Sequence, residues 1–317
     1  ALAPLDFSAL LSRAMLLERL GDARSGEAFG HALAQAPPDD RIPSTMLKAV
    51  DHARRSAAEY QNKLEAHLAS AVPAALGRPE RERVERFVSN AARRTRHFHQ
   101  EPTDFHYPGL PEFEFHDPVL FPELDALEAA TDQIRQEYER LVASSAAEMV
   151  PYTQYPAHVP LGQWRELNNN RDWTAIHLLQ NGQPVPSNAD RCPITMQAVS
   201  KLPQPHIRGA SPNAMFSLLA PRTRIPPHTG VANTRLVCHL PLMVPPNCGF
   251  RVGASTCEWE VGKAFVFDDT IEHEAWNDSD ELRVVLIVDL WAPTLTVAER
   301  EAVAAVISAA GVSFKGG

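Results

Sequence analysis

The sequence has 317 residues, the length of about two domains or of one large domain with a helical extension. Its hydrophobic content of 44% and charged content of 22% are near the globular average, which argues against a disordered or fibrous chain. A net charge of −9 argues against nucleic acid as the main partner, because neutralising phosphates needs a basic surface. Since every apolar run is far shorter than the roughly 20 residues of a membrane span, we also expect no transmembrane helix and no membrane partner.

Residues 1–100 are predicted to form a helical region. They are rich in Ala, Leu, Glu and Arg, and their apolar residues have helical spacing. One short pattern is similar to the second helix of a tetratricopeptide unit; it consists of Gly21, Ser25, Phe29, Ala32 and Pro37. Only one partial copy is present, so an ordinary helical hairpin is an equal alternative. Docking of a protein partner and packing support for the second domain both stay open as roles.

One segment of this region departs from the acidic average. Residues 78–99 are locally basic, but glutamates are interleaved with the arginines. This mixed pattern favours a solvated helix face over an RNA-binding arm.

The cysteines indicate neither a zinc site nor a disulfide scaffold. There are four of them, without C-x-x-C spacing, at Cys192, Cys238, Cys248 and Cys257. A reducing, cytoplasmic location is therefore the expectation.

The second domain is predicted over residues 101–317. Its first part is rich in proline, and HYPGLPEFEFHDPVLFPEL reads as an extended, aromatic lead-in. Pro122 then suits the first turn of a helix. The apolar stripe of that helix consists of Leu124, Leu127, Ile134, Tyr138 and Leu141.

Beyond about residue 150 the pattern changes to short strands. The candidates are Ala214–Ala220, Arg235–Val244, Phe250–Gly253, Ala264–Phe267 and Arg283–Trp291. Many short strands without intervening helices favour an antiparallel sandwich or barrel over a doubly wound parallel sheet. Finally, Thr296 and Glu299 have the spacing of a capping box, which predicts a C-terminal helix that ends near Gly311.

Two histidines stand out, because the chain lacks a serine nucleophile elbow and a phosphate-binding glycine loop. His228 follows two prolines at a predicted turn, and His273 follows the strand that ends at Phe267. They are 45 residues apart, which is enough to bring two strands of a jelly roll side by side. From spacing alone, a metal site and ordinary surface or core imidazoles both remain open.

Arg283 is the second unusual feature. Strand alternation places it on one face with Asp289 and with apolar side chains. A buried guanidinium without a partner costs several kcal/mol, so Arg283 needs a carboxylate. Asp289 or a glutamate could provide it, or a ligand carboxylate held in bidentate fashion. By the same alternation, Arg235, Val237 and His239 share one strand face, and Ser217 shares another with Met215 and Leu219.

The stretch from about His106 to Arg300 resembles the aspartyl/asparaginyl β-hydroxylase family of iron(II)- and 2-oxoglutarate-dependent dioxygenases. The resemblance covers nearly two thirds of the chain. Its matching segments are YPGLPEFEF, CPITMQAV, SLLAPRTRIPPHTGVANTRLVCHLPLMVPPNCGFRVG, EVGKAFVFDDTIEHEAWNDSDELRVVLIVDLW and LTVAER. It implies an α+β protein whose helical N-terminal region precedes a double-stranded β-helix (a cupin-like jelly roll) with flanking helices and Fe(II) at the open end.

The resemblance also implies roles for single residues. His228 and His273 would be the metal ligands, and Gly230 stands where most relatives of this oxygenase class have a carboxylate ligand. Arg283 and Ser217 would bind the distal carboxylate of 2-oxoglutarate. His239 would contact the carboxylate nearer the metal, and Arg235 would face the substrate.

The implied reaction is hydroxylation, with O₂ as co-substrate and with succinate and CO₂ as products. The expected substrate is the β-carbon of an Asp- or Asn-type residue, or a related peptide or small molecule with a carboxylate or amide.

Two departures qualify the implied activity. Where the family pattern reads R-L-R-x-H-L, this chain has Val237 in place of the second arginine. Where the family pattern reads W-H-P, this chain has Ala292 in place of the histidine. An altered substrate, a weak enzyme and a loss of catalysis are all compatible with Val237. The alternatives are a lipid acyl hydroxylase and a catalytically silent, cupin-like protein that binds or senses a ligand.

Overall fold

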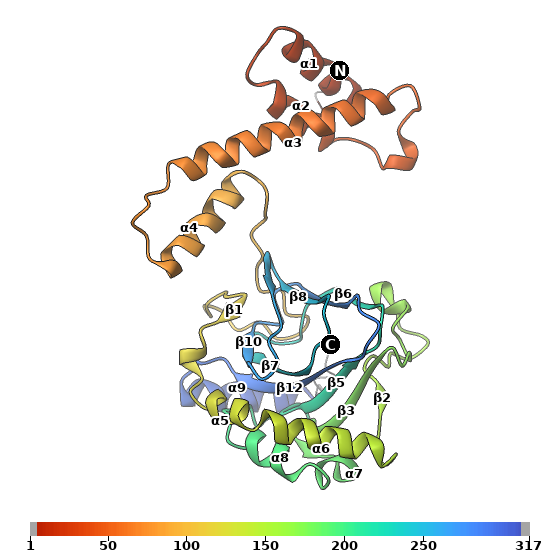
Figure 1. The fold of residues 1–317 in the computed structure, drawn as a ribbon, viewed down its shortest axis with the longest axis vertical. Helices are drawn as coiled ribbons and strands as arrows, with labels where there is room; N and C mark the ends of the chain where they lie inside the picture. The colour runs from red at the N-terminus through yellow and green to blue at the C-terminus, as the bar shows by residue number, and fades with distance from the viewer. Residues whose placement is uncertain (1–4, 312–317) are drawn as a thin grey trace. The chain divides into compact units, whose positions relative to one another are not determined.

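The structure is a computed structural model that describes residues 5–311. The chain divides into two compact units, Ala1–His97 and Phe98–Gly317. Within the described residues, none of the helices combines the length and the apolar character that crossing a membrane requires. Both units are shown in Figure 1.

The first unit is helical. Its elements are α1 (Phe7–Arg19), α2 (Ser25–Leu33), the 3-10 turn η1 (Asp39–Arg41), α3 (Leu47–Ser70) and α4 (Arg78–Ala91). Asp6 caps the start of α1 by accepting a hydrogen bond from the backbone of Ala9. Phe29 and Ala32 on α2 are fully buried. A Cβ on Gly26 would lie 2.3 Å from the Cβ of Tyr60, so only glycine allows α2 and α3 to approach this closely. The likeness to a tetratricopeptide unit stays a prediction.

The second unit begins with the proline-rich lead-in, which is mainly non-helical and contains the 3-10 turn η2 (Pro118–Leu120). The prediction of one long helix after Pro122 is wrong. Two helices, α5 (Leu124–Ala129) and α6 (Thr131–Ala143), meet at a break, where the hydroxyl of Thr131 donates to the carbonyl oxygen of Glu128. All five residues of the predicted apolar stripe are nevertheless buried.

Two antiparallel sheets form the body of the second unit. The large sheet has the order β1 (Phe115–His116), β10 (Phe265–Phe267), β7 (Arg235–Met243), β12 (Arg283–Trp291), β5 (Ala214–Leu219), β3 (Trp173–Gln180) and β2 (Val150–Pro151), with β4 (Gln183–Pro184) paired to β3. The small sheet has the order β6 (Thr223–His228), β11 (His273–Asn277), β8 (Cys248–Val252) and β9 (Ser255–Cys257). The remaining elements are η3 (Gly162–Arg165), α7 (Pro186–Ala189), α8 (Pro193–Val199) and α9 (Val297–Ala310).

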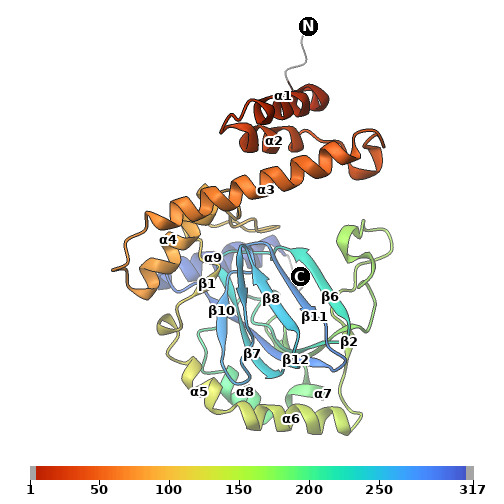
Figure 2. The same cartoon turned by 45° about the horizontal axis from the view of Figure 1, so that its top comes forward.

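The layers of this unit follow from the alternation of side chains along the strands. Leu236, Cys238 and Leu240 on β7 belong to a core cluster that also contains the buried faces of α5, α6, α8 and α9. Val237, between them, belongs to a second cluster between the two sheets. Figures 1 and 2 show the helices α5, α6 and α8 on one side of the large sheet and the small sheet on the other. The predicted helical region followed by a jelly roll of the cupin type is confirmed.

The strands that sequence analysis missed are informative. β6 contains Pro226 and Pro227, which have no backbone N–H to donate. A central strand needs its N–H groups to bond the neighbouring strand on each side. The fold accommodates them because β6 is at the edge of the small sheet. The five predicted strands are present, each with ends within two residues of the expected positions.

The C-terminal helix α9 is confirmed in detail. Thr296 and Glu299 form the complete capping box, and Gly311 ends the helix in the left-handed conformation with φ of 65°. The hydroxyl of Tyr107 donates to Glu299 at 2.9 Å, so the lead-in is tied to the start of this helix.

A buried histidine in β1 makes the stability of this unit sensitive to acid. Neither ring nitrogen of His116 has a hydrogen-bond partner among residues 5–311, and burial lowers its pKa from 6.5 to about 4. Between these pH values the unfolded chain binds the proton first, so stability is complete above pH 6.5 and falls as the pH drops towards 4. We expect His116→Phe to reduce this acid-induced loss by about 3 kcal/mol in urea titrations. Parallel pH curves for the two proteins would contradict this expectation.

Candidate functional site

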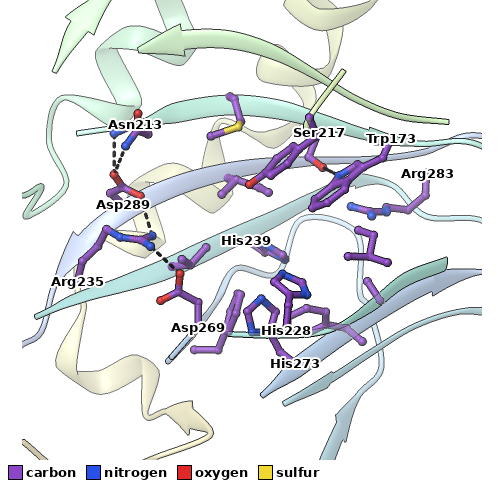
Figure 3. A pocket seen from close by; sticks show the side chains of 18 residues that line it. Trp173, Asn213, Ser217, His228, Arg235, His239, Asp269, His273, Arg283 and Asp289 are labelled. Atoms are coloured by element: carbon purple, nitrogen blue, oxygen red, sulfur yellow. Dashed lines mark hydrogen bonds and ion pairs between the residues drawn. The ribbon is translucent and has the colours of Figure 1, made fainter. Parts of the chain in front are cut away.

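The candidate site is a cavity between the two sheets, shown in Figure 3. All six residues predicted to form a site line it, and the complete lining is Tyr152, Trp173, Asn213, Met215, Ser217, Ile225, His228, Arg235, Val237, His239, Phe250, Phe267, Asp269, His273, Ala275, Arg283, Ile287 and Asp289.

The two predicted metal ligands are side by side. His228 is the last residue of β6 and His273 the first of β11, and the two are directly paired in the small sheet. Their ring centroids are 4.0 Å apart. Each Nδ1 is hydrogen-bonded to a backbone carbonyl, that of Pro226 at 2.7 Å and that of Ile271 at 3.1 Å. These bonds orient both rings and leave the two Nε2 atoms for another partner.

Both imidazoles are neutral near pH 7. Burial lowers the pKa of His228 to about 3, with a further contribution from His273. Burial likewise lowers the pKa of His273 to about 4. A divalent metal binds neutral imidazole, so the pair is in the form that a metal requires.

Asp269 occupies the space beside Gly230. A Cβ on Gly230 would lie 2.1 Å from Oδ2 of Asp269 and 2.7 Å from its Oδ1. The backbone N–H of Gly230 also donates to the carbonyl oxygen of Asp269 at 2.6 Å. Position 230 therefore excludes any side chain, and the carboxylate next to the histidines comes from Asp269 instead.

This close approach predicts the effect of one added methyl group. We expect Gly230→Ala to destabilise the protein by about 1–3 kcal/mol, because Asp269 is held by Arg235 and cannot yield easily. In an Asp269→Ala background the same change should cost much less, since the clash is removed. Urea unfolding of the four proteins of this cycle measures the difference. An equal cost in both backgrounds would show that Asp269 is not the obstacle.

Arg235 is held between two carboxylates. It pairs with Asp269 at 2.6 Å and with Asp289 at 3.1 Å, and all three side chains are buried. Burial opposes its charge, but the two carboxylates raise its pKa above the usual value. Asp289 additionally accepts hydrogen bonds from Ser211 and from the backbone and side chain of Asn213. Figure 3 shows this chain of polar contacts running from Asn213 through Asp289 and Arg235 to Asp269.

Arg283 has the opposite environment. Its side chain is fully buried, and within residues 5–311 no carboxylate pairs with it. Burial lowers its pKa to about 10, so it remains charged at pH 7. Its guanidinium lies 5.1 Å from the ring of Trp259. The prediction that Asp289 could neutralise it is wrong, because Asp289 faces Arg235 across the strand pair β12–β7.

Two further predicted residues complete this end of the cavity. Ser217 is buried and accepts a hydrogen bond from Nε1 of Trp173 at 3.1 Å, which leaves its own hydroxyl proton for a ligand. His239 is surrounded by aromatic rings, and its buried Nδ1 has no partner in the part of the chain that the structure describes. Burial and the nearby charge of Arg283 hold the pKa of His239 well below 6.5.

Comparison with known proteins identifies the family. Residues 128–293, just over half of the chain, match the family described as Aspartyl/Asparaginyl beta-hydroxylase. The chain belongs to this family. Its members are named as hydroxylases, so the cavity is the candidate active site of a hydroxylase.

Three curated relatives illustrate the range of the family. The Ornithine lipid ester-linked acyl 2-hydroxylase of Rhizobium tropici is 34% identical over 61% of this chain and 66% of its own length. The Aspartate beta-hydroxylase domain-containing protein 2 of Xenopus tropicalis is 30% identical over 64% of this chain and 54% of its own. The Aspartyl/asparaginyl beta-hydroxylase of Homo sapiens is 35% identical over 44% of this chain and 18% of its own. This chain thus spans less than two thirds of each relative.

Among solved structures, a cupin domain from Bordetella pertussis is 16% identical, with a TM-score of 0.21 over 25% of this chain and 79% of its own. This likeness is too distant to bear on function.

The cavity of this family member fits a divalent metal with a dicarboxylate ligand. Two neutral imidazoles lie together, and Asp269 has a buried Oδ1 without a partner. Within the described part of the chain, no carboxylate pairs with the buried charge of Arg283, and no group bonds the buried Nδ1 of His239. These groups are costly to bury unless a ligand satisfies them.

Sequence analysis missed several residues at this candidate site. Asp269 had a usable signal, because Asp268 and Asp269 form an acidic pair in the turn before His273. Tyr152 and Trp164 had none, since both lie in the irregular segment between β2 and β3. The ring of Trp164 in η3 lies edge-on to His228 at 4.9 Å, and Tyr152 is stacked on Trp173.

Proposed function

We propose that this protein is an Fe(II)- and 2-oxoglutarate-dependent hydroxylase. One observation carries the proposal: a pair of neutral histidines and a buried arginine without a protein carboxylate line the same cavity. The first arrangement suits a metal and the second suits a dicarboxylate, and 2-oxoglutarate is a dicarboxylate that also has metal-binding oxygens. In Figure 3, Arg283 lies apart from the network of Asp269, Arg235 and Asp289, with the histidines between them.

In this proposal each residue has a specific task. His228 and His273 hold the metal, which supplies the activation of O₂ when it is bound. Arg283 and Ser217 hold the distal carboxylate of 2-oxoglutarate, and Nδ1 or Nε2 of His239 is available to the carboxylate nearer the metal. Asp269 balances the charge of the metal with its free oxygen. Burial raises the pKa of Asp269, and its ion pair with Arg235 opposes that rise and holds the carboxylate in place.

Two classes of substrate are consistent with the cavity. The relatives that are aspartyl/asparaginyl hydroxylases favour the β-carbon of an Asp- or Asn-type residue, or a related small molecule with a carboxylate. The proposal also has Arg235 face the substrate. Its guanidinium already pairs with the carboxylates of Asp269 and Asp289.

The second candidate is an acyl group of a lipid. It is favoured by the apolar residues that line the cavity, which include Met215, Ile225, Val237 and Ile287, and by the relative that is an ornithine lipid acyl hydroxylase.

The test is the conversion of 2-oxoglutarate to succinate. The purified chain, loaded anaerobically with Fe(II), is incubated with O₂ and 2-oxoglutarate, and succinate is measured with and without candidate peptides, amino acids and lipids. We expect succinate to form only when Fe(II) is present and the histidine pair is intact. His228→Ala therefore serves as the negative control. Tight binding of 2-oxoglutarate without any succinate would favour the silent, ligand-binding alternative.

A further inference from the structure

The guanidinium of Arg283 gives none of its hydrogen-bond donors to the described protein. Within residues 5–311 its side chain has no hydrogen bond and no ion pair, and Figure 3 draws no dashed line to it. A guanidinium has five N–H donors in a planar fork. A protein carboxylate would neutralise the charge, but it would also occupy this fork, and an anionic ligand would have to displace it. Arg283 is therefore held in the cavity by another kind of contact.

That contact is with Trp259. The guanidinium carbon of Arg283 lies over the indole, 5.1 Å from the ring centroid. Within the described chain, this indole is the one aromatic ring in contact with the Arg283 guanidinium. The face of an indole is the negative part of its quadrupole and attracts a cation without accepting a conventional hydrogen bond. The charge is thus partly stabilised while the N–H groups stay free.

Trp259 is itself fixed by neighbouring rings. Its ring centroid lies 5.6 Å from that of Phe250 and 5.7 Å from that of Phe265, and both contacts are edge-to-face. Phe250 is on β8 of the small sheet, and Phe265 is on β10 of the large sheet. The indole is therefore anchored to both sheets that enclose the cavity, and Arg283 lies against a rigid wall.

The N–H group of this indole indicates that packing alone does not explain the residue. Nε1 of Trp259 is buried and has no hydrogen-bond partner among the described residues. A buried N–H without a partner is unfavourable, and phenylalanine would fill much of the same space without one. Tryptophan thus lowers stability at a place where its face contacts a buried charge, which is typical of a residue that serves binding.

We propose that Trp259 is a positioning residue of the cosubstrate pocket: its indole face holds the Arg283 guanidinium with the N–H donors free for the distal carboxylate of 2-oxoglutarate. This inference rests on the proposed function. Because the guanidinium is oriented before the ligand arrives, binding does not have to immobilise a long, flexible side chain. Trp259 thereby favours 2-oxo acids that have a second carboxylate over those that lack one.

The experiment is a titration of 2-oxoglutarate into the protein loaded with Zn(II), which occupies the histidine pair without redox chemistry. Isothermal calorimetry gives the dissociation constant. We expect Trp259→Leu to weaken binding by about three- to ten-fold, because the ligand then has to immobilise Arg283. Trp276→Leu is the matched control. It removes an indole 5.9 Å from the guanidinium of Arg224, neither residue lines the cavity, and binding should be unchanged.

The conservative variant Trp259→Phe keeps an aromatic face and removes the N–H without a partner. It should bind 2-oxoglutarate more tightly than Trp259→Leu does, and it should unfold at the temperature of the wild type or above it. If Trp259→Leu does not fold, Trp259→Met, which also lacks a ring, takes its place in every comparison.

The probe 2-oxobutanoate, which lacks the distal carboxylate, assigns the effect to Arg283. Trp259→Leu should leave the dissociation constant of this probe unchanged. In an Arg283→Met background, Trp259→Leu should cause no further loss of 2-oxoglutarate binding. Equal weakening of both ligands, or a full additional loss in Arg283→Met, would show that Trp259 acts through another group, such as His239 at 5.6 Å between ring centroids. Either result would overturn the inference.

The outcomes separate this inference from the function on which it rests. If the wild-type Zn(II) protein binds no 2-oxoglutarate, the proposed function fails and the inference fails with it. If the wild type binds 2-oxoglutarate and Trp259→Leu binds it equally well, only the role of Trp259 fails. A lower unfolding temperature of Trp259→Leu with unchanged affinity would assign the tryptophan a purely structural part.

Discussion

Replacing either His228 or His273 by alanine is expected to abolish high-affinity metal binding and all metal-dependent turnover. The structure offers two imidazoles and no side chain at Gly230, so each variant would retain one histidine beside Asp269. A loss of at least about a thousand-fold in metal affinity is expected, since one imidazole with a carboxylate is a weak site. The measurement is metal content after anaerobic reconstitution with Fe(II), followed by titration with Co(II).

His206→Ala is the control for this experiment, because His206 is exposed and is not among the residues that line the cavity. Its metal content should equal that of the wild type. Near-normal Fe(II) content in His228→Ala or in His273→Ala would remove that histidine from the metal site.

Arg283→Met is expected to raise the dissociation constant of 2-oxoglutarate by at least about thirty-fold. Truncating one partner of a buried charge pair costs about 2–5 kcal/mol, and the partner here would be the ligand itself. The same variant should unfold at the same or a higher temperature without ligand. Arg283 is a buried charge that no carboxylate neutralises within the described chain. Replacing it by an apolar side chain of similar length removes the free-energy cost of burying that charge.

The two readouts distinguish a ligand-binding arginine from a structural one. Arg283→Lys should recover binding only in part, because an ammonium group cannot form the paired hydrogen bonds of a guanidinium. Arg222→Met, which removes an exposed pair with Asp280, controls for the general loss of positive charge. A lower unfolding temperature together with unchanged affinity would mean that Arg283 holds the fold and not the cosubstrate.

The fold was predictable to the extent that side-chain alternation controls it. The central strands β5, β7 and β12 are continuous apolar runs, and α9 has an explicit start and stop signal, so all four elements were found near their true ends. The strands that carry the histidines were not. β6 contains two prolines and β11 is largely polar, and such sequences become strands only because neighbouring strands supply their hydrogen bonds.

The candidate site was predictable as a set of residues but not as a set of contacts. Alternation correctly placed Arg235, His239 and Arg283 on inward faces. It could not assign Asp289, because that depends on the register between β12 and β7, which contains an irregularity near Val284. Asp289 is paired with Val237 in that register and therefore reaches Arg235 rather than Arg283. Tyr152 and Trp164 come from segments without regular periodicity, where only the folded chain determines position.

The lead-in to the second unit has a practical consequence for anyone who shortens this protein. Gln100 accepts a hydrogen bond from Asn233 and donates one to Asp268, while the backbone N–H groups of Glu101 and Thr103 donate to Thr270 and Gly230. These partners are in the two loops that follow His228 and precede His273. A fragment that starts at the predicted boundary, after residue 100, would lack the Gln100 side chain, which is hydrogen-bonded to both loops. Expression vectors for the isolated second unit should therefore begin no later than Phe98, even though every residue lining the cavity lies beyond Val150.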